Sequence, residues 1–515
     1  MTRRLLRVKQ SIESNSNYGD VVSYDKIIMG LGIIRSIERN TDKRDIGNPL
    51  GETLRIMLNS YCEGNKSKVE LREWYKDEEA LQERIGIKGE ELGEQDVYRP
   101  MDYLEEGVQK EIVDDILGVL VLEFGLSAEV INMDSSSSYF EGSKCKLGKK
   151  GYSRDHRSDR DQVNYDIGEA GGYVTRIGIH EGDKVDNRVI DEAVEEMGEV
   201  NYLSGAVLVV DRGMSLKRNR IKILEKGFSY VASLKIEGGT REEVEGIEEE
   251  EYKEEVTAGE GKDVYKVERR KGKIKTKDGE VEVVDHIYYN EKKAKQEKEA
   301  RQERIEKAKA SVESIQEQVE AGRIKKPSAI VGKAKRALKK QKVLCYFKVS
   351  FDRKTKKIIL QERQEELKRK ERLDGKFVIQ TPQVDWTSEE VLKAYRGHDG
   401  AEKVIDVLKN VIEVRPIRHF NPQRVKAHIF LCILACIVMA VLRYLSRQVG
   451  LTEGIVSIRD QLKKIKRVVS TLTIGETVSK TVTLTGLTPK AKLLLEKIGV
   501  PLPDGPQELW LEVCL

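Results

Sequence analysis

The sequence lacks several features that would assign a protein to a class at once. Its six cysteines include no CxxC pair, so neither a zinc ribbon nor a redox dithiol is indicated. Cys432 and Cys436 lie four residues apart in an apolar run, which favours buried hydrophobic side chains over metal ligands. That run, Ile429 to Leu442, is too short to span a bilayer but long enough for a core helix. With no apolar stretch after the basic N-terminal residues, we expect no signal peptide and no membrane partner, and a cytoplasmic, reducing location.

A large charge excess is also missing. Lys and Arg number 92 against 88 Asp and Glu, which gives a net charge of +4, although 35% of the residues are charged. Such a balance does not by itself indicate nucleic acid, so local clusters must decide the matter. The 515 residues are enough for roughly two to four domains, and 39% hydrophobic residues allow a sizeable core.

Changes in composition divide the chain into five regions. Residues 1–125 look helical and are the expected DNA-binding domain, although no helix-turn-helix stands out. Residues 126–235 alternate between strand and helix patterns, and residues 377–450 resume that pattern after an insertion at 236–376. The tail, residues 451–515, is mixed. The predicted fold is therefore α/β, with a helical N-terminal domain and a mixed α+β insertion.

The alternating region predicts a mainly strand-built core. Val130 to Met133 forms a short apolar strand that ends on Asp134, and Ala206 to Val210 is an uninterrupted aliphatic run typical of a strand buried on both faces. Further strands are expected at 163–167, 173–179 and 228–234, and helices at 187–197 and 215–226. The insertion contains an acidic stretch (242–255), a hairpin turning at Asp278-Gly279, a long charged helix (291–321) and a basic run (323–342).

Two aspartates are placed where α/β sheets carry their sites. Asp134 and Asp211 each follow an apolar strand, and sites in open α/β sheets form outside the carboxyl ends of strands. Acidic residues also end strands as ordinary turn formers, so neither position is decisive alone.

A helix predicted over residues 388–411 supplies a further group of polar side chains. At 100° per residue, Tyr395, His398, Glu402 and Lys409 share a stripe about 60° wide beside an apolar face. The alternative is an ordinary solvated helix edge with a Glu/Lys pair.

These residues resemble a known signature. Tyr395-Arg-Gly-His398-Asp-Gly-Ala-Glu402 followed by Lys409 resembles the Tyr-x2-Arg-x3-Glu-x6-Lys pattern of prokaryotic insertion-sequence transposases of the DDE class, except that His398 stands where the family usually has Arg. The resemblance extends over roughly residues 40 to 445. Its other blocks are 133–141, Gly151 to Arg157 with 161–163, 209–214, 374–381 and Arg415 to His419.

The resemblance implies a ribonuclease H-like core and a two-metal phosphodiester chemistry. Asp134, Asp211 and Glu402 would bind Mg²⁺, with Mn²⁺ as a substitute, and Asp134 would bridge the two ions. Water would free a 3′-OH at the end of the element, and that hydroxyl would attack target DNA. The implied partners are double-stranded DNA, as terminal inverted repeats and target, and a second copy of the chain on paired ends. The protein would then be nucleoid-associated.

Several side chains, most of them basic, are expected to contact DNA. Tyr395 and Lys409 would lie beside the scissile phosphate; His398 either does the same, with pH dependence, or is a packing substitute. Arg154 and Arg157 either bind phosphate or form a salt-bridged turn, and Arg212 follows the second aspartate. The basic run, which includes Lys333 and Arg336, is either a phosphate-tracking surface or a charged helical hairpin kept soluble.

Two other functions remain open at this point. A ribonuclease H-like nuclease without strand transfer would use the same three carboxylates. A catalytically inactive, transposase-derived DNA-binding protein would not need them, and the departure at His398 keeps this alternative open. A coiled-coil role for 291–321 is disfavoured, because no sustained apolar heptad runs through it.

Overall fold

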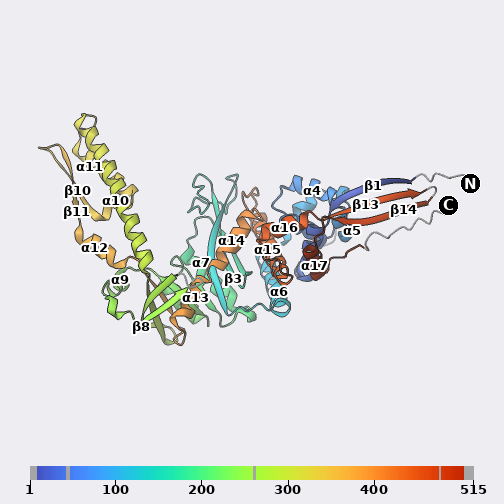
Figure 1. The fold of residues 1–515 in the computed structure, drawn as a ribbon, viewed down its shortest axis with the longest axis horizontal. Helices are drawn as coiled ribbons and strands as arrows, with labels where there is room; N and C mark the ends of the chain where they lie inside the picture. Colours follow the sequence, from blue (N-terminus) through green and yellow to red (C-terminus); the bar gives the residue numbers. More distant parts are fainter. Residues whose placement is uncertain (1–7, 42–46, 259–262, 475–476, 504–515) are drawn as a thin grey trace, which may run out of the picture. The chain divides into compact units, whose positions relative to one another are not determined.

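The structure of the protein is a computed structural model that describes residues 8–41, 47–258, 263–474 and 477–503 (Figure 1). The chain divides into two compact units, which we describe separately. The first unit comprises residues 1–208, 226–228 and 398–515, and the second comprises residues 209–225 and 229–397. Cys514, one of the six cysteines, lies outside the described residues.

The first unit is mostly helical around a small group of strands. Its helices are α1 (Gly19–Gly30), α2 (Ile33–Asn40), α3 (Leu50–Cys62), α4 (Lys68–Asp77), α5 (Glu79–Ile85), α6 (Glu106–Phe124), α7 (Asp186–Gly198), α14 (Asp399–Asn410), α15 (Pro422–Gln448), α16 (Ile455–Lys463) and α17 (Pro489–Ile498). Its strands are β1 (Val8–Asn17), β2 (Val130–Tyr139), β3 (Gln162–Ala170), β4 (Tyr173–Glu181), β13 (Lys466–Ile474) and β14 (Thr477–Thr485). Short 3-10 turns lie at Gly89–Glu91, Gln95–Val97, Arg99–Tyr103 and Asn201–Leu203.

The second unit holds the rest of the strands and a long helical hairpin. Its helices are α8 (Lys217–Glu225), α9 (Gly238–Glu245), α10 (Glu291–Glu320), α11 (Pro327–Lys340), α12 (Gln364–Leu373) and α13 (Ser388–Arg396). Its strands are β6 (Ser229–Leu234), β7 (Glu254–Ala258), β8 (Asp263–Thr276), β9 (Gly279–Tyr289), β10 (Phe347–Asp352), β11 (Lys357–Glu362) and β12 (Lys376–Thr381). Single 3-10 turns lie at Glu249–Glu251 and Leu344–Tyr346.

One mixed sheet runs in the order β4-β3-β2-β5-β6-β12-β9-β8-β7. The first unit holds β4, β3 and β2, which pair antiparallel with Asp134 opposite Ile167. The second holds β6, β12, β9, β8 and β7, paired antiparallel from β6 onward. β5 (Val207–Val210) is the strand at which the units divide. The predicted α/β class is confirmed, and this order is consistent with a ribonuclease H-like core extended by strands of the insertion.

Most predicted core strands and helices are present within a residue or two, but the first core strand is longer than predicted. It does not end on Asp134; β2 continues through a run of four serines to Tyr139. These serines pair with β3 between Val163 and Asp166 and are buried. A serine run reads as a loop from composition, yet its small side chains fit between packed strands and their hydroxyls find partners such as Tyr165 and Arg154.

The predicted helix over 388–411 is also wrong in one respect. The structure breaks it into α13 and α14 at Gly397, so Tyr395 lies on a different helix from Glu402 and Lys409. The N–H of Gly397 still bonds to the carbonyl of Lys393, and the helical bonds resume only when Ala401 bonds to His398. Glycine has the lowest helix propensity after proline, which explains the break there. The stripe of four side chains on one helix therefore does not exist.

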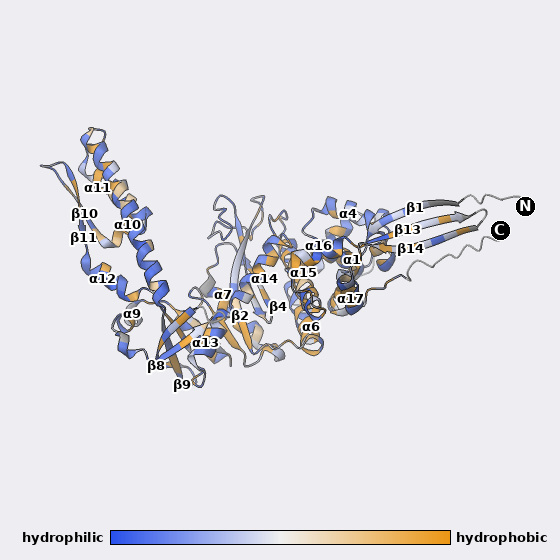
Figure 2. Ribbon diagram, viewed as in Figure 1, coloured by the Kyte–Doolittle hydropathy of each residue, from blue (hydrophilic) through white to orange (hydrophobic). Residues whose placement is uncertain are grey.

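The apolar run 429–442 forms the centre of α15, a helix of 27 residues. Among the described helices it is the one long and apolar enough to cross a membrane, but 89% of its most apolar window is buried inside the protein. Figure 2 shows it as a largely hydrophobic helix, in contrast to the hydrophilic α10. The prediction of a core helix is confirmed.

The two ends of the chain share a sheet that the sequence analysis did not predict. β13 and β14 form an antiparallel hairpin, and β1 pairs with β13 on its other side (Figure 1). Pairing between strands more than 400 residues apart leaves no local signal in the sequence. The region predicted to be helical, residues 1–125, therefore also contains a strand, β1.

The insertion contains the predicted hairpin and charged helices. β8 and β9 are joined by a tight turn at Lys277-Asp278, and α10 matches the predicted helix almost residue for residue. α10 packs against α11 through a narrow stripe that includes Ile305, Ala308 and Val312. The sequence allowed for a charged helical hairpin here, and the structure contains a packed pair of helices, whereas the buried Arg301 of α10 pairs with Asp374.

Candidate active site

Asp134 lies in the middle of β2. Its Oδ1 accepts a hydrogen bond of 2.7 Å from the backbone N–H of Ser135, and its side chain is half-buried. Asn132, two residues earlier on the same face of the strand, donates a 2.7 Å hydrogen bond to the carboxylate of Glu169 on β3. These two hydrogen bonds hold the side chains of Asp134 and Asn132 in fixed orientations.

Glu402 is exposed in the first turn of α14, and this helix packs on β2 and β3. The contact is close at Gly400, where a side chain would collide with the carboxylate of Glu169. Since Glu169 also binds Asn132, the N-terminal turn of α14 lies against the face of β2 that contains Asp134. The structure therefore places the helix of the third predicted carboxylate over the strand of the first.

Asp211 belongs to the second unit and follows β5 directly, as predicted. Its Oδ1 accepts hydrogen bonds from the backbone N–H groups of Gly213 (2.8 Å) and Met214 (3.1 Å). These two bonds hold the carboxylate at the end of the strand in a turn of the Asx type. The next residue, Arg212, is exposed, and its Nε lies 3.4 Å from the hydroxyl of Ser233.

The donor chemistry of the three carboxylates fits Mg²⁺, which prefers hard oxygen ligands and retains waters. Within the residues that the structure describes, no three His, Cys, Asp or Glu side chains form a group that could hold a metal ion. Asp134 and Glu402 belong to one unit and Asp211 to the other. The metal-binding triad therefore remains a prediction.

Lys409 has a partner that the sequence did not reveal. Its Nζ donates a 2.8 Å hydrogen bond to Oδ1 of Asp155, and Nη1 of Arg415 lies 3.1 Å from the same oxygen. Asp155 and Lys409 are 5% and 10% exposed. Burial lowers the pKa of Lys409, Asp155 raises it, and the positive charges of Arg415 and Arg154 lower it further. One carboxylate thus lies among three cations.

The sequence left two roles open for Arg154 and Arg157, namely phosphate binding and a salt-bridged turn, and the two residues differ in the structure. Arg154 bonds to β2, where its backbone N–H donates to Ser137 and its Nη2 donates to Ser135 at 2.9 Å. Arg157 instead forms a two-pronged ion pair with Asp159, at 2.9 Å for each bond, which lowers the pKa of Asp159 to about 2. Arg157 therefore forms the salt-bridged turn, whereas Arg154 lies beside the strand of Asp134.

The other two residues of the signature, Tyr395 and His398, belong to different units. Tyr395 is half-buried on α13 of the second unit. His398 precedes the first turn of α14 in the first unit, and its buried Nδ1 has no hydrogen-bond partner among the described residues. DNA contacts by these two residues remain predictions.

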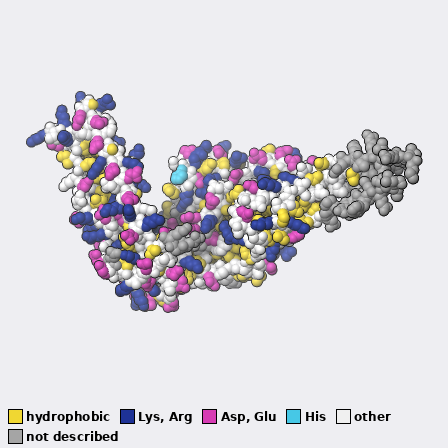
Figure 3. Space-filling model, viewed as in Figure 1, with side chains coloured by type: hydrophobic (Ala, Val, Ile, Leu, Met, Phe, Trp, Pro, Cys, Tyr) yellow, Lys and Arg dark blue, Asp and Glu magenta, His cyan; other side chains and the backbone are white. Residues whose placement is uncertain are grey.

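Lys333 and Arg336 lie on the exposed side of α11. The opposite side of this helix, formed by Ile330, Ala334 and Leu338, is buried, in part against α10. Figure 3 shows Lys and Arg side chains interleaved with Asp and Glu over the region of α10 and α11. The basic run is thus solvated, and both predicted roles remain open.

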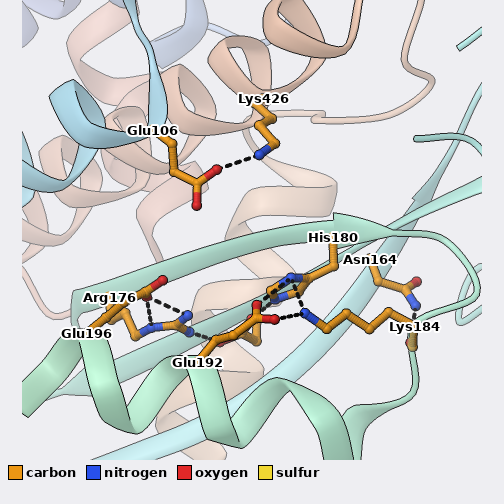
Figure 4. Close-up of polar contacts among 9 residues, drawn as sticks. Glu106, Asn164, Arg176, His180, Lys184, Glu192, Glu196 and Lys426 are labelled. Carbon is orange, nitrogen blue, oxygen red and sulfur yellow. Dashed lines mark hydrogen bonds and ion pairs between the residues drawn. The ribbon is translucent and has the colours of Figure 1, made fainter. Parts of the chain in front are cut away.

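A cavity of about 580 Å³ lies in the first unit, between α6, β4 and α7. Its wall carries a buried ionic network (Figure 4). Arg176 and His180 both contact the fully buried Asp166, and Arg176 also donates to Glu196 at 2.7 Å. Burial lowers the pKa of His180 to about 4. The remaining pairs are Lys184–Glu192 and Lys426–Glu106. Because each cation has an acidic partner, we assign this network to the fold.

Sequence reasoning missed Asp155 and Arg415 as site residues. Both lie in blocks that carried the family resemblance, Gly151–Arg157 and Arg415–His419, but nothing in their spacing indicates that they meet Lys409. The signal available was a lone acid between arginines in one block and two arginines in the other.

A family model built on known proteins matches the region that contains Asp134 and Asp211. Residues 126–294 match the model of a family described as "Transposase DDE domain", a stretch that includes Asp134 and Asp211 and ends before Glu402. No curated protein matches the chain. Among solved structures, the chain is similar to the cryo-EM structure of a piggyBac transposase synaptic complex with hairpin DNA, at 7% identity and a TM-score of 0.39, over 85% of this chain and 79% of that one. A likeness this remote carries no argument about activity.

Proposed function

We propose that this protein is a DDE transposase of a prokaryotic insertion sequence, which cuts DNA at the ends of its element and joins the freed 3′-OH to target DNA. The observation that carries the proposal is the family match over 126–294, which contains Asp134 and Asp211. The packing of α14 on β2 supports it, because the N-terminal turn of the helix that carries Glu402 lies against the face of the strand that contains Asp134.

In this function Asp134, Asp211 and Glu402 hold the divalent ions, Mg²⁺ or Mn²⁺. When bound, such ions activate the attacking oxygen and stabilise the leaving one. The chain's own basic side chains bind and orient the DNA backbone: Arg154 beside β2, and Lys409 with Arg415 around Asp155. These cations favour a polyanion at the side of the first unit that carries Asp134. The finer partners, terminal inverted repeats and a second copy of the chain on paired ends, belong to the same proposal.

The test is an in vitro reaction of the full chain with Mg²⁺ and a labelled duplex that carries the flanking end of the element. We expect end cleavage and joined product with the wild type, and neither with Asp134→Asn or Asp211→Asn. Asp406→Asn is the matched control, because Asp406 is an exposed carboxylate on α14 whose only described bond is to Asn410.

The other outcomes separate the alternatives. Cleavage without joined product would identify a nuclease. Tight duplex binding with no chemistry in the wild type would identify an inactive DNA-binding protein. Full activity in Asp211→Asn would remove this residue from the site.

A further inference from the structure

A small cavity in the first unit is lined almost entirely by positive or neutral polar side chains. Its volume is about 120 Å³, room for on the order of four water molecules, and a phosphate group has five heavy atoms. No acidic side chain contributes to it. The lining residues are Asn65, Lys66, Ser67, Lys68, Tyr98, Pro416, Arg418, His419 and His428.

Lys68 is the buried cation of this cavity. It is 6% exposed, and its Nζ donates a 3.0 Å hydrogen bond to the hydroxyl of Tyr61, over whose ring it also lies. Among the described residues it has no carboxylate partner. Burial lowers the pKa of Lys68 to about 8, so the side chain is mostly charged at neutral pH. Lysine is rarely buried this deeply without an anion, because the desolvation of the ammonium is costly.

Among the described residues, the groups around Lys68 form a hydrogen-bonded chain that contains no anion. Tyr61 passes the hydrogen bond on to Nδ1 of His428 at 3.0 Å, and Nε2 of His428 lies 3.0 Å from the carbonyl of Val414. In this order Lys68 donates to Tyr61, Tyr61 donates to His428, and His428 donates to the carbonyl. The chain of bonds requires a neutral His428, and burial lowers its pKa to about 4. Two of the three ammonium hydrogens of Lys68 are left without an acceptor in this network.

Two further features make the cavity electropositive. Arg418 is exposed at its lining, where it would guide an anion in from solvent. Lys68 is also the first residue of α4, a helix of 10 residues, and the N-terminus of a helix favours negative charge. Ser67 and Glu70 cap each other at this end, so the backbone N–H groups of both are already occupied. The ammonium of Lys68 is therefore the main attraction.

We propose that this cavity, around Lys68, Arg418 and His428, is a binding site for a phosphate group. The group is either a backbone phosphate of DNA or a free phosphate ion, since both present the same tetrahedral oxyanion. The proposal does not depend on the three carboxylates or on any cleavage activity. A phosphate site here would also give a role to Arg418 and His419 of the Arg415–His419 block. The proposed catalysis uses only Arg415 of that block.

The test measures the thermal unfolding of the full chain while inorganic phosphate replaces chloride at constant ionic strength. A ligand that binds only the folded state raises the Tm, and the rise grows with the logarithm of the ligand concentration once this exceeds the Kd. We expect this rise in the wild type and its loss, or at least a tenfold weaker apparent Kd, in Lys68→Met and in Arg418→Ala. Arg418 is exposed, so its removal should leave the fold intact. Lys76→Met is the matched control, because Lys76 is an exposed lysine on the same helix, paired with Glu73.

A second arm identifies the source of the phosphate. If the site takes a DNA phosphate, free phosphate competes with duplex at constant ionic strength, and Lys68→Met lowers the salt dependence of duplex binding by about one unit of slope. If the site takes free phosphate, duplex affinity is the same in Lys68→Met and wild type. A wild type with no phosphate-specific rise in Tm, or a Lys68→Met protein that binds phosphate as tightly as wild type, would overturn the proposal.

Discussion

Lys409 of α14 and Asp155 of the loop after β2 form a nearly solvent-free ion pair, with 2.8 Å between Nζ and Oδ1. The lysine of the transposase-like signature is thus already paired with a carboxylate of the protein. Arg415 shares the same carboxylate oxygen, and the second oxygen of Asp155 is buried with no hydrogen-bond partner in the described parts of the chain. A DNA phosphate that approaches Lys409 would meet a cation group whose charge is partly compensated in advance.

Removal of Asp155 should destabilise the fold. Asp155→Ala leaves Lys409 and Arg415 with uncompensated charge, and breaking a buried pair from one side typically costs about 3–5 kcal/mol. Lys409→Met should cost less, because Arg415 still accompanies Asp155. The double variant should cost less than the sum of the two single variants. Urea unfolding of the four proteins measures this coupling, and strictly additive costs would show that the contact contributes nothing.

Glu402→Gln should abolish Mg²⁺-dependent cleavage while leaving the fold unchanged. Glu402 is exposed, so the amide alters no buried contact, whereas a weakened metal site should cost on the order of a thousandfold in rate. Gel assays of end cleavage measure the effect, with Asp406→Asn on the same helix as control. Cleavage retained in Glu402→Gln would mean that another carboxylate completes the site.

The order of strands and helices along the core could be predicted from the sequence, because each element depends on a local pattern of residues. The apolar runs before Asp134 and before Asp211 each indicate a strand within a few residues. The failures lie where tertiary contacts override composition. The serines after Asp134 form a strand because β3 pairs with them, and β1 forms a strand because β13 lies beside it.

Gly375→Ala should destabilise the second unit. Gly375 has φ +72°, where an L-residue is strained, and an added Cβ would collide with the backbone carbonyl of Asn290. The strain alone costs about 1–2 kcal/mol, and the collision adds to it because backbone cannot move aside easily. Chemical unfolding should show the loss. Gly332→Ala in α11 is the contrasting control: nothing lies near its Cβ position, and alanine should stabilise the helix by up to about 1 kcal/mol.

Glu78→Gln should stabilise the protein increasingly as the pH rises. Burial raises the pKa of Glu78 from 4.5 to about 8, and the nearby charges of Glu63 and Asp20 raise it further while Asn17 opposes the shift. The folded state therefore keeps a proton that the unfolded state has lost, so the wild type loses stability between pH 4.5 and pH 8. Glutamine keeps an acceptor for Asn17 and does not titrate.

The measurement for Glu78 is the free energy of unfolding of both proteins from pH 5 to pH 8.5. The difference should be small at pH 5 and grow to a few kcal/mol at most by pH 8, since one pKa unit corresponds to about 1.4 kcal/mol. A difference that is constant over this range would show that Glu78 is ionised in the folded protein.

From the sequence, individual residues of the candidate site could be predicted, but their contacts with one another could not. The apolar strands before Asp134 and Asp211 mark both aspartates as candidates without deciding either, and the resemblance joins them to Glu402. The partnership of Asp155 with Lys409 could not be predicted, because the two residues are 254 positions apart and their meeting depends on how α14 packs. The break at Gly397 is a similar case: a helical wheel assumes a continuous helix, and it placed Tyr395 with residues of another helix.

Substitution of Lys333 and Arg336 decides between the two roles left open for the basic run. Both side chains are exposed on α11, and alanine is a good helix former, so Lys333→Ala with Arg336→Ala should change stability by no more than about 0.5 kcal/mol. If α11 tracks DNA phosphates, duplex affinity should fall, and the slope of log affinity against log salt should lose about 0.9 for each contact removed. Lys307→Ala is the control, since Lys307 on α10 is exposed but already paired with Glu303. An unchanged slope in the α11 variant would leave the hairpin as a charged, solvated helix pair, because a true phosphate contact cannot be removed without releasing fewer counterions on binding.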